Sequence, residues 1–464
     1  MVFSSLTFLF LFLPAVIACY YLLPGIRAKN AVLCLFSLLF YAWGEPVYVL
    51  LMAASILLNY LAGLGMERFP RRKKLLLLLA LLFNLGAIGV FKYAGFFLSG
   101  LSSLFALNLP VLRIALPIGI SFYTFQILSY VIDVYHGRVA AQRSLLSLAT
   151  YITMFPQLVA GPIVRYDTVR EELCRRSVTV NDFAEGLCRF FFGLGKKVLI
   201  ANQMALAADA VFDAAAVPSS AVLWIGALCY AMQIYYDFSG YSDMAIGMGR
   251  KFGFHFSKNF NYPYIADSVT DFWRRWHISL SVWFREYVYI PLGGNRCNVL
   301  RHIFNMLVVW LLTGLWHGAA WNFVLWGLYY GLLLILEKHV LGRVLPKIPK
   351  AVRRIVTFLL ALIGWVIFRV ENLSALGRCL AGLFSFDFSG TGAFFLSSSN
   401  ALSPLLLLPI ALLGCLPWKH HLEKRFGDSV GFGTLRLVFA FLLWIASVAM
   451  LLGESYNPFI YFRF

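Results

Sequence analysis

Apolar residues recur along this chain in runs that are long enough to cross a membrane. A transmembrane helix needs about 20 predominantly apolar residues to span the hydrocarbon core. Some of the runs are too short or too interrupted for a simple span. We expect spans or half-spans at 3–23, 31–43, 46–66, 75–98, 111–133, 143–161, 186–212, 219–238, 302–318, 320–338, 353–370, 404–417 and 433–453. The pattern predicts an all-α, polytopic membrane protein.

Basic residues between the early runs indicate the orientation of the chain. Arg27 and Lys29 follow the first run, and five more basic residues lie within 68–74, two short apolar runs later. Two crossings place both clusters on one face, and the positive-inside rule puts that face in the cytoplasm and the N-terminus outside. No basic residue precedes the first run and no small-residue cleavage site follows it. We therefore expect a span there and not a cleaved signal peptide.

The composition supports the membrane class and excludes others. The chain is 61% hydrophobic and 13% charged, whereas a soluble domain carries about 25% charged residues. The formal charge of +18 suits loops that face anionic lipid. The Lys and Arg residues are scattered between the apolar runs and not gathered on one face, which argues against a nucleic-acid partner. The eight cysteines form no CxxC pair, so neither a metal site nor a disulfide framework is expected. No repeat or linker divides the chain, so we expect one domain over 1–464.

Two aspartates follow the apolar run at 219–234, in the stretch "YYDFSGYSDMAIG". Asp237 and Asp243 could bind an acceptor substrate or orient a histidine. They could equally form ion pairs with Arg250 or Arg274. The sequence leaves these alternatives open.

The next segment is aromatic and basic but has no apolar run of span length. Aromatic and aliphatic residues recur there at three- and four-residue steps, which predicts a helix with Thr270 or Asp271 as its N-cap. The apolar positions are Trp273, Trp276, Leu280, Trp283, Phe284 and Tyr287. His277 falls on this apolar face, whereas Arg274 and Arg275 lie away from it. An interfacial helix would explain the tryptophans and arginines, but it gives no reason for a histidine on the buried face.

A second histidine, His317, lies in the almost entirely apolar stretch 306–336. As one helix this stretch would measure roughly 46 Å, well beyond the hydrocarbon core, so a break is expected. Gly314 and Gly318 bracket His317, and a break costs least at glycine. An ionisable residue at membrane depth is a functional candidate. The alternative is a structural histidine bonded to a carbonyl of a neighbouring helix.

Histidine suits acyl transfer, because its pKa of about 6.5 lets the neutral ring accept a hydroxyl proton near neutral pH. Burial favours the neutral form further. The chain has no Gly-x-Ser-x-Gly elbow, P-loop or dinucleotide fingerprint. If the protein is an enzyme, direct transfer assisted by histidine is the simplest chemistry that these residues offer.

At these residues the sequence resembles the membrane-bound O-acyltransferase family, in particular its bacterial alginate O-acetyltransferase branch. The resemblance runs nearly end to end, from "VFSSLTFLFLFLP" to the terminal "YNPFIYFRF". Its most specific parts are "YYDFSGYSDMAIG", "FWRRWHISLSVWFREYVYIPLGGNR" and "LLTGLWHGAAWNFVLWG". One departure is Tyr330, where many relatives have histidine; this difference is expected to alter the acceptor or partner and not to abolish activity.

The resemblance implies a ring of tilted and re-entrant helices around a central tunnel, in which a cytoplasmic acyl donor meets an outward-facing acceptor. It maps the essential histidine onto His317 and a second catalytic position onto His277. It implies acetyl-CoA as donor, with no permanently bound cofactor and no metal. The expected acceptor is an alginate-, cellulose- or peptidoglycan-type polysaccharide, or an extracytoplasmic acetyltransferase partner. The expected location is the bacterial cytoplasmic membrane.

Six further residues are candidates for substrate binding. Guanidinium groups suit the phosphates of CoA, although contact with lipid headgroups would explain two arginines as well. The aromatic candidates could instead be wall and packing residues. The six are Tyr236, Asp237, Arg274, Arg275, Trp276 and Trp316.

Two alternative functions remain open. Within the same family, the D-alanyl-transferring branch that acts on teichoic acid has a similar centre. A transporter for a polysaccharide or lipid-linked sugar could use His317 as a proton relay. Transporters often contain two matching halves with broken helices, and no second copy of "WRRWH" or "GLWHG" occurs here.

Overall fold

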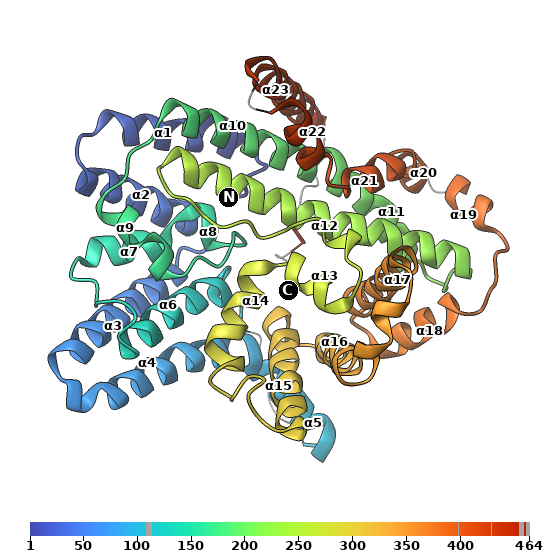
Figure 1. Cartoon of the computed structure of the whole chain (residues 1–464), viewed down its shortest axis with the longest axis horizontal. Helices are drawn as coiled ribbons and strands as arrows, with labels where there is room; N and C mark the ends of the chain where they lie inside the picture. The colour runs from blue at the N-terminus through green and yellow to red at the C-terminus, as the bar shows by residue number, and fades with distance from the viewer. Residues whose placement is uncertain (108–113, 398, 428, 454–458, 461–464) are drawn as a thin grey trace. The chain divides into compact units, whose positions relative to one another are not determined.

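The long apolar runs form helices, and every regular element among the described residues is helical (Figure 1). The computed structural model describes residues 1–107, 114–397, 399–427, 429–453 and 459–460. The predicted all-α class is confirmed. Contacts divide the chain into two units, Met1–Phe190 with Met244–Ser257, and Phe191–Asp243 with Lys258–Phe464. That residues 1–464 form one domain, arranged as a ring around a tunnel, stays a prediction.

The first unit contains the N-terminal helices. Its elements are η1 (Phe8–Phe12), α1 (Leu13–Leu22), α2 (Ile26–Ala42), α3 (Tyr48–Arg68), η2 (Pro70–Arg72), α4 (Lys73–Ile88), η3 (Gly89–Tyr93), α5 (Ala94–Phe105), α6 (Ile120–Tyr135), α7 (Leu145–Thr153), α8 (Phe155–Leu158) and α9 (Tyr166–Cys174). The helices α10 (Val180–Gly195) and α12 (Ser220–Lys251) each contribute residues to both units.

In the first unit, α3 and α4 are joined by a reciprocal amide pair. Asn59 Nδ2 donates to Asn84 Oδ1 at 3.2 Å, and Asn84 Nδ2 donates to Asn59 Oδ1 at 2.9 Å. Both side chains are buried, and the pair satisfies their polar atoms between two apolar helices. Leucines on the other side of α4, such as Leu78 and Leu82, are exposed, as expected for a surface that faces lipid.

The second unit contains the remaining helices. They are η4 (Lys196–Ala201), α11 (Asn202–Phe212), η5 (Pro263–Ile265), α13 (Val269–Arg275), α14 (Ile278–Phe284), η6 (Arg285–Tyr289), α15 (Val299–His317), α16 (Trp321–His339), η7 (Leu341–Arg343), η8 (Leu345–Lys347), α17 (Lys350–Arg369), α18 (Leu373–Leu383), α19 (Thr391–Ser397), α20 (Ser399–Leu405), α21 (Leu408–Gly414), α22 (Trp418–Phe426) and α23 (Val430–Gly453).

The number of complete spans is smaller than the number of apolar runs. Within the described residues, five helices are long and apolar enough to cross a membrane, or up to seven if each of two bent pairs is one span. The five are Tyr48–Arg68, Pro70–Phe105, Val299–His317, Lys350–Arg369 and Val430–Gly453. Each of them overlaps an expected span, which confirms a multi-pass membrane protein.

Some of the apolar runs do not form single helices. The run 143–161 divides into the short helices α7 and α8, because Met154 leaves the helical conformation with ψ 108° and Pro156 follows it. The run 111–133 contains a helix only from Ile120, after Gly119 with its φ of 74°, and residues 111–113 lie outside the described residues.

Candidate active site

His317 is the last residue of α15, and the chain leaves the helix at Gly318 with φ −167° and ψ 158°. The expected break is therefore confirmed, and α15 and α16 lie side by side as a hairpin (Figure 1). A Cβ atom on Gly318 would overlap the Phe323 ring, and one on Gly314 would overlap the Phe323 carbonyl. The two glycines let the hairpin close tightly next to the histidine.

Aromatic rings surround the buried imidazole of His317. Its ring centroid lies 5.0 Å from that of Trp316, 5.0 Å from Trp326 and 5.1 Å from Phe368, all in edge-to-face geometry. Phe368 belongs to α17, and Asn322 Nδ2 fixes that segment by donating to the Phe368 carbonyl at 2.9 Å. The imidazole is thus packed among aromatic rings that hold its orientation.

His277 lies between two short helices and not within one. α13 ends at Arg275, α14 begins at Ile278, and His277 adopts the left-handed conformation with φ 44° and ψ 54°. The expectation of one helix through this segment is wrong, as are Thr270 and Asp271 as N-cap, since Ser268 caps α13. A left-handed conformation costs a residue with a side chain roughly 1–2 kcal/mol. Such strain is often retained at functional sites.

Asn259 determines which nitrogen of His277 carries the proton. The Asn259 Oδ1 atom accepts from the Ser279 backbone N–H at 3.1 Å. Because that N–H can only donate, the atom facing it must be the amide oxygen. The same oxygen lies 3.3 Å from His277 Nδ1, so Nδ1 must carry the hydrogen. Asn259 Nδ2 donates to Ser242 Oγ at 3.2 Å, which fixes the amide orientation from its other side.

The opposite nitrogen, His277 Nε2, is left with its lone pair. It is buried and has no hydrogen-bond partner in the part of the chain that the structure describes. Burial lowers the pKa of His277 from 6.5 to about 3, so the ring is neutral at physiological pH. A neutral imidazole with a free lone pair can accept a hydrogen bond or a proton from a substrate.

Trp316 contacts both histidines. Its ring centroid is 5.7 Å from that of His277 and 5.0 Å from that of His317. Phe238 of α12 covers another side of His277, with centroids 4.6 Å apart. The structure therefore brings His277, at the junction of α13 and α14, next to Trp316 and His317 at the end of α15.

The two aspartates pair with lysines that the sequence did not indicate. Lys197 Nζ lies 2.6 Å from Asp237 Oδ1, and Lys196 Nζ lies 2.6 Å from Asp243 Oδ2. The ion-pair alternative was correct in kind, but Arg250 and Arg274 were the wrong partners. Both lysines belong to the π-helical turn η4, whose packing beside α12 no sequence spacing indicates.

Two of the aromatic candidates, Tyr236 and Trp276, occupy packing positions, and so does Tyr330. The Tyr236 hydroxyl donates to the Ala411 carbonyl at 2.6 Å. Trp276 packs against Trp365 in a tilted arrangement, with ring centroids 4.6 Å apart. Tyr330 is buried against Trp326 at 5.2 Å, one ring removed from His317.

The two arginines of α13 differ in their surroundings. Arg275 is held by Asp271, with 2.8 Å between Nε and Oδ2, and it also donates to the Asn261 carbonyl. Arg274 is exposed. Of the two, Arg274 has the guanidinium that is accessible to a phosphate group.

Sequence reasoning missed Asn259, because it lies in a loop where no periodicity marks a buried position. Its amide is buried among aromatic residues of the segment "NFNYPY". A polar residue within such an aromatic segment was the available signal. Among the described residues, no group of three or more His, Cys, Asp or Glu side chains is arranged to hold a metal ion.

Comparison with known proteins identifies relatives of this chain. The model of the MBOAT family, the membrane-bound O-acyltransferases, matches residues 138–376. The chain is 40% identical to the probable alginate O-acetylase AlgI of Pseudomonas putida, over 100% of both chains. It is 33% identical to the peptidoglycan O-acetyltransferase of Helicobacter pylori, over 100% of this chain and 98% of that protein. It is 31% identical to the teichoic acid D-alanyltransferase of Bacillus subtilis, over 47% of this chain and 58% of that protein.

Proposed function

The chain belongs to the membrane-bound O-acyltransferase family, and we propose that it moves an acetyl group from cytoplasmic acetyl-CoA to an extracytoplasmic polysaccharide. The acceptor is an alginate-, cellulose- or peptidoglycan-type polymer, reached directly or through a partner acetyltransferase. The protein lies in the bacterial cytoplasmic membrane with its N-terminus outside. The full-length similarity to proteins named for O-acetylation of alginate and peptidoglycan supports this choice of reaction.

The observation that carries the proposal is the pair of buried histidines that share Trp316. His317 acts as the general base, and His277 Nε2 accepts a hydrogen bond that orients the acceptor hydroxyl. Both imidazoles are buried among aromatic rings, and burial lowers the pKa of His277, which keeps that ring neutral.

The reaction is balanced without a further reactant. The acceptor hydroxyl oxygen forms a bond to the acetyl carbonyl carbon while its proton passes to His317. The C–S bond of the thioester then breaks, and the imidazolium returns the proton to the leaving sulfur. The products are an acetyl ester and free CoA. The side chains contribute positioning, a proton carrier and the exclusion of water.

The alternative of D-alanyl transfer has narrower support. The teichoic acid D-alanyltransferase aligns with less than half of this chain, whereas the O-acetylating relatives align over all of it. Tyr330 contacts the aromatic cluster through Trp326, so it influences the site through packing. We assign Arg274 to the phosphates of the donor, because Arg275 is already held by Asp271.

The first test separates an enzyme from a transporter. The purified protein in detergent, where no ion gradient can exist, is expected to release free CoA from acetyl-CoA when the acceptor polymer or partner protein is present. Transfer of an acyl group from a thioester to a hydroxyl is favourable without a gradient. Radiolabelled acetyl-CoA, followed into the polymer fraction, measures the reaction.

A protein in which Asp387 is replaced by asparagine serves as the control, because this exposed side chain only caps its own turn. It should transfer label at the wild-type rate. If label moved only in sealed vesicles under a proton gradient, and sugar crossed the membrane without acylation, the transporter would be the correct assignment.

The second test concerns Asn259 as a positioning residue. Replacing Asn259 with alanine removes the acceptor that holds His277 Nδ1–H, so the ring can rotate or change its tautomer. Acetyl transfer is expected to fall about 10-fold to 100-fold, by analogy with the loss that follows removal of the partner that orients a metal-bound histidine. Initial rates of labelled acetyl transfer provide the measurement.

Asn259→Asp distinguishes positioning from packing. The aspartate retains the acceptor, so it should restore part of the activity. Its negative charge raises the pKa of His277, and the neutral form is then lost at a higher pH than in the wild type. The acid limb of the rate profile should move to higher pH. If both variants lost activity equally and the profile did not shift, Asn259 would be structural.

A further inference from the structure

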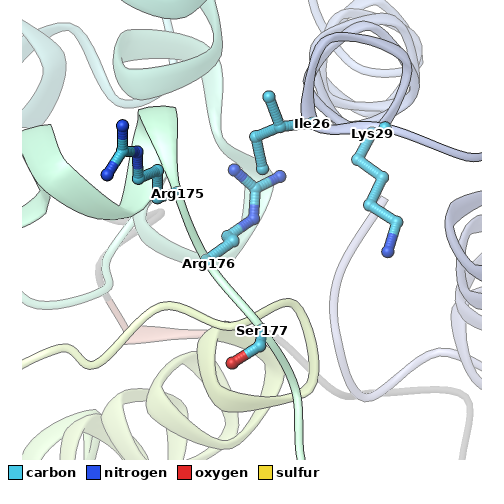
Figure 2. A pocket seen from close by; sticks show the side chains of 6 residues that line it. Ile26, Lys29, Arg175, Arg176 and Ser177 are labelled. Carbon is cyan, nitrogen blue, oxygen red and sulfur yellow. The ribbon is translucent and has the colours of Figure 1, made fainter.

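A basic hollow of about 490 Å³ lies in the first unit, and none of its lining residues is assigned to acyl transfer. It is formed by the start of α2 and by the segment that joins α9 to α10. Its lining residues are Gly25, Ile26, Lys29, Arg175, Arg176 and Ser177 (Figure 2). We propose that this hollow binds a phosphate group. With a lipid headgroup as the source of the phosphate the proposal is independent of acyl transfer, whereas with CoA as the source it rests on the proposed function.

The charges in the hollow are all of one sign. In the described part of the chain, no carboxylate lies within 4.0 Å of the charged atoms of Lys29, Arg175 or Arg176. Lys29 Nζ lies 5.1 Å from the centre of the Tyr20 ring, a contact that orients the ammonium group without neutralising it. The Glu172 carboxylate acts on Arg176 only from beyond ion-pair distance, so the three cations still repel one another, and a bound phosphate would relieve that repulsion.

Arg176 is held rigidly at the base of the hollow. Its Nε donates to the Tyr20 hydroxyl and the Phe252 carbonyl, both at 2.9 Å. Its Nη1 donates to Asn30 Oδ1 at 2.7 Å and to the Glu172 carbonyl at 3.0 Å. These bonds to neutral acceptors fix the guanidinium in place without supplying a compensating negative charge.

The remaining nitrogen of Arg176 indicates a missing acceptor. Nη2 is buried and donates to nothing among the described residues. Burial also lowers the pKa of this guanidinium, which shows that its positive charge is poorly solvated. A buried donor of this kind is costly to leave unsatisfied, and a phosphate oxygen is the acceptor that suits a guanidinium.

The start of α2 adds a third contribution. Gly25 is its N-cap and has no side chain to accept from the first-turn N–H groups. These donors, together with the positive end of the helix dipole, favour an anion at the same place as the three cations. Cations, an unsatisfied guanidinium nitrogen and a free helix start thus meet in one hollow.

Two molecules could supply the phosphate. One is the headgroup of an anionic phospholipid, which would tie α2 to the membrane surface. The other is the nucleotide part of CoA. Both present phosphate oxygens, so the hollow itself does not choose between them, and the experiment has one arm for each source.

The test uses the full-length protein in which Lys29 and Arg175 are both replaced by glutamine. These side chains are at least partly exposed, so their loss should not unfold the protein. Arg176 is left intact because it holds several neighbouring segments. The first arm measures the affinity for free CoA by calorimetry in detergent. The second measures, by native mass spectrometry, the phosphatidylglycerol retained after extraction from vesicles of equimolar phosphatidylglycerol and phosphatidylcholine.

In the double variant, either the affinity for CoA or the amount of retained phosphatidylglycerol should fall at least about tenfold, because each substitution removes a charge-assisted contact. Arg27→Gln, a matched control, makes the same change on the same helix without lining the hollow. It should behave like the wild type.

Loss of CoA affinity assigns the donor nucleotide, and loss of retained phosphatidylglycerol assigns the lipid. Wild-type values in both arms, from a variant that elutes as a single species with an unchanged Tm, would overturn the proposal. A protein without acetyl transfer that still lost lipid in the double variant would disprove only the proposed function.

Discussion

Replacing His317 with alanine is expected to abolish acetyl transfer, a loss of at least about 10³-fold, while the protein still accumulates and inserts in the membrane. His317 is the proposed proton acceptor, and it lies at a helix break that the glycines Gly314 and Gly318 make possible. The aromatic rings around it offer no other base. Labelled acetyl transfer by purified wild-type and variant protein is the measurement.

Two further variants test whether the loss of activity comes from the missing base and not from a damaged structure. His317→Gln keeps a polar side chain of similar length, so it should preserve the packing against Trp326 and Phe368 and still be inactive. His136→Ala removes an exposed histidine directly after the end of α6 and should have no effect. Full acetylation by His317→Ala would contradict the catalytic assignment. A loss that appeared only together with a lower Tm would indicate a structural role.

The features that follow from local physics could be predicted from the sequence. Span-length apolar runs predict membrane helices, since the hydrocarbon core accepts few alternatives. The break beside His317 follows from a stretch too long for one crossing that carries glycines at its centre. The same reasoning failed at 143–161, where the apolar run conceals a break at Met154 and Pro156.

Features that depend on tertiary contacts could not be predicted. The pattern around His277 is helical by periodicity, yet the chain turns there because two backbone bonds hold it from both sides. Ile278 N–H donates to the Asn259 carbonyl and Asn261 N–H donates to the Arg275 carbonyl, each at 2.9 Å. The lysine partners of Asp237 and Asp243 come from a segment some 40 residues earlier. No local spacing encodes either contact.

The left-handed conformation of His277 leads to the final prediction. His277→Ala should lower acetyl transfer about 10²-fold or more, the range of a positioned proton-transfer group. The alanine variant keeps the backbone strain, because any Cβ is disfavoured at φ 44° and ψ 54°. His277→Gly relieves that strain, so its free energy of unfolding should exceed that of the alanine variant by roughly 1 kcal/mol.

His277→Gly should nevertheless be as inactive as His277→Ala, because both lack Nε2. Stability and activity are then expected to change independently, which a packing role does not allow. Trp276→Phe is the matched control: it alters the neighbouring residue, which packs against Trp365, and should reduce transfer only modestly. The measurements are the Tm in detergent and the initial rate of labelled acetyl transfer. If His277→Gly recovered activity in step with its stability, or if Trp276→Phe were the more damaging change, the histidine would be a packing residue and His317 would act without it.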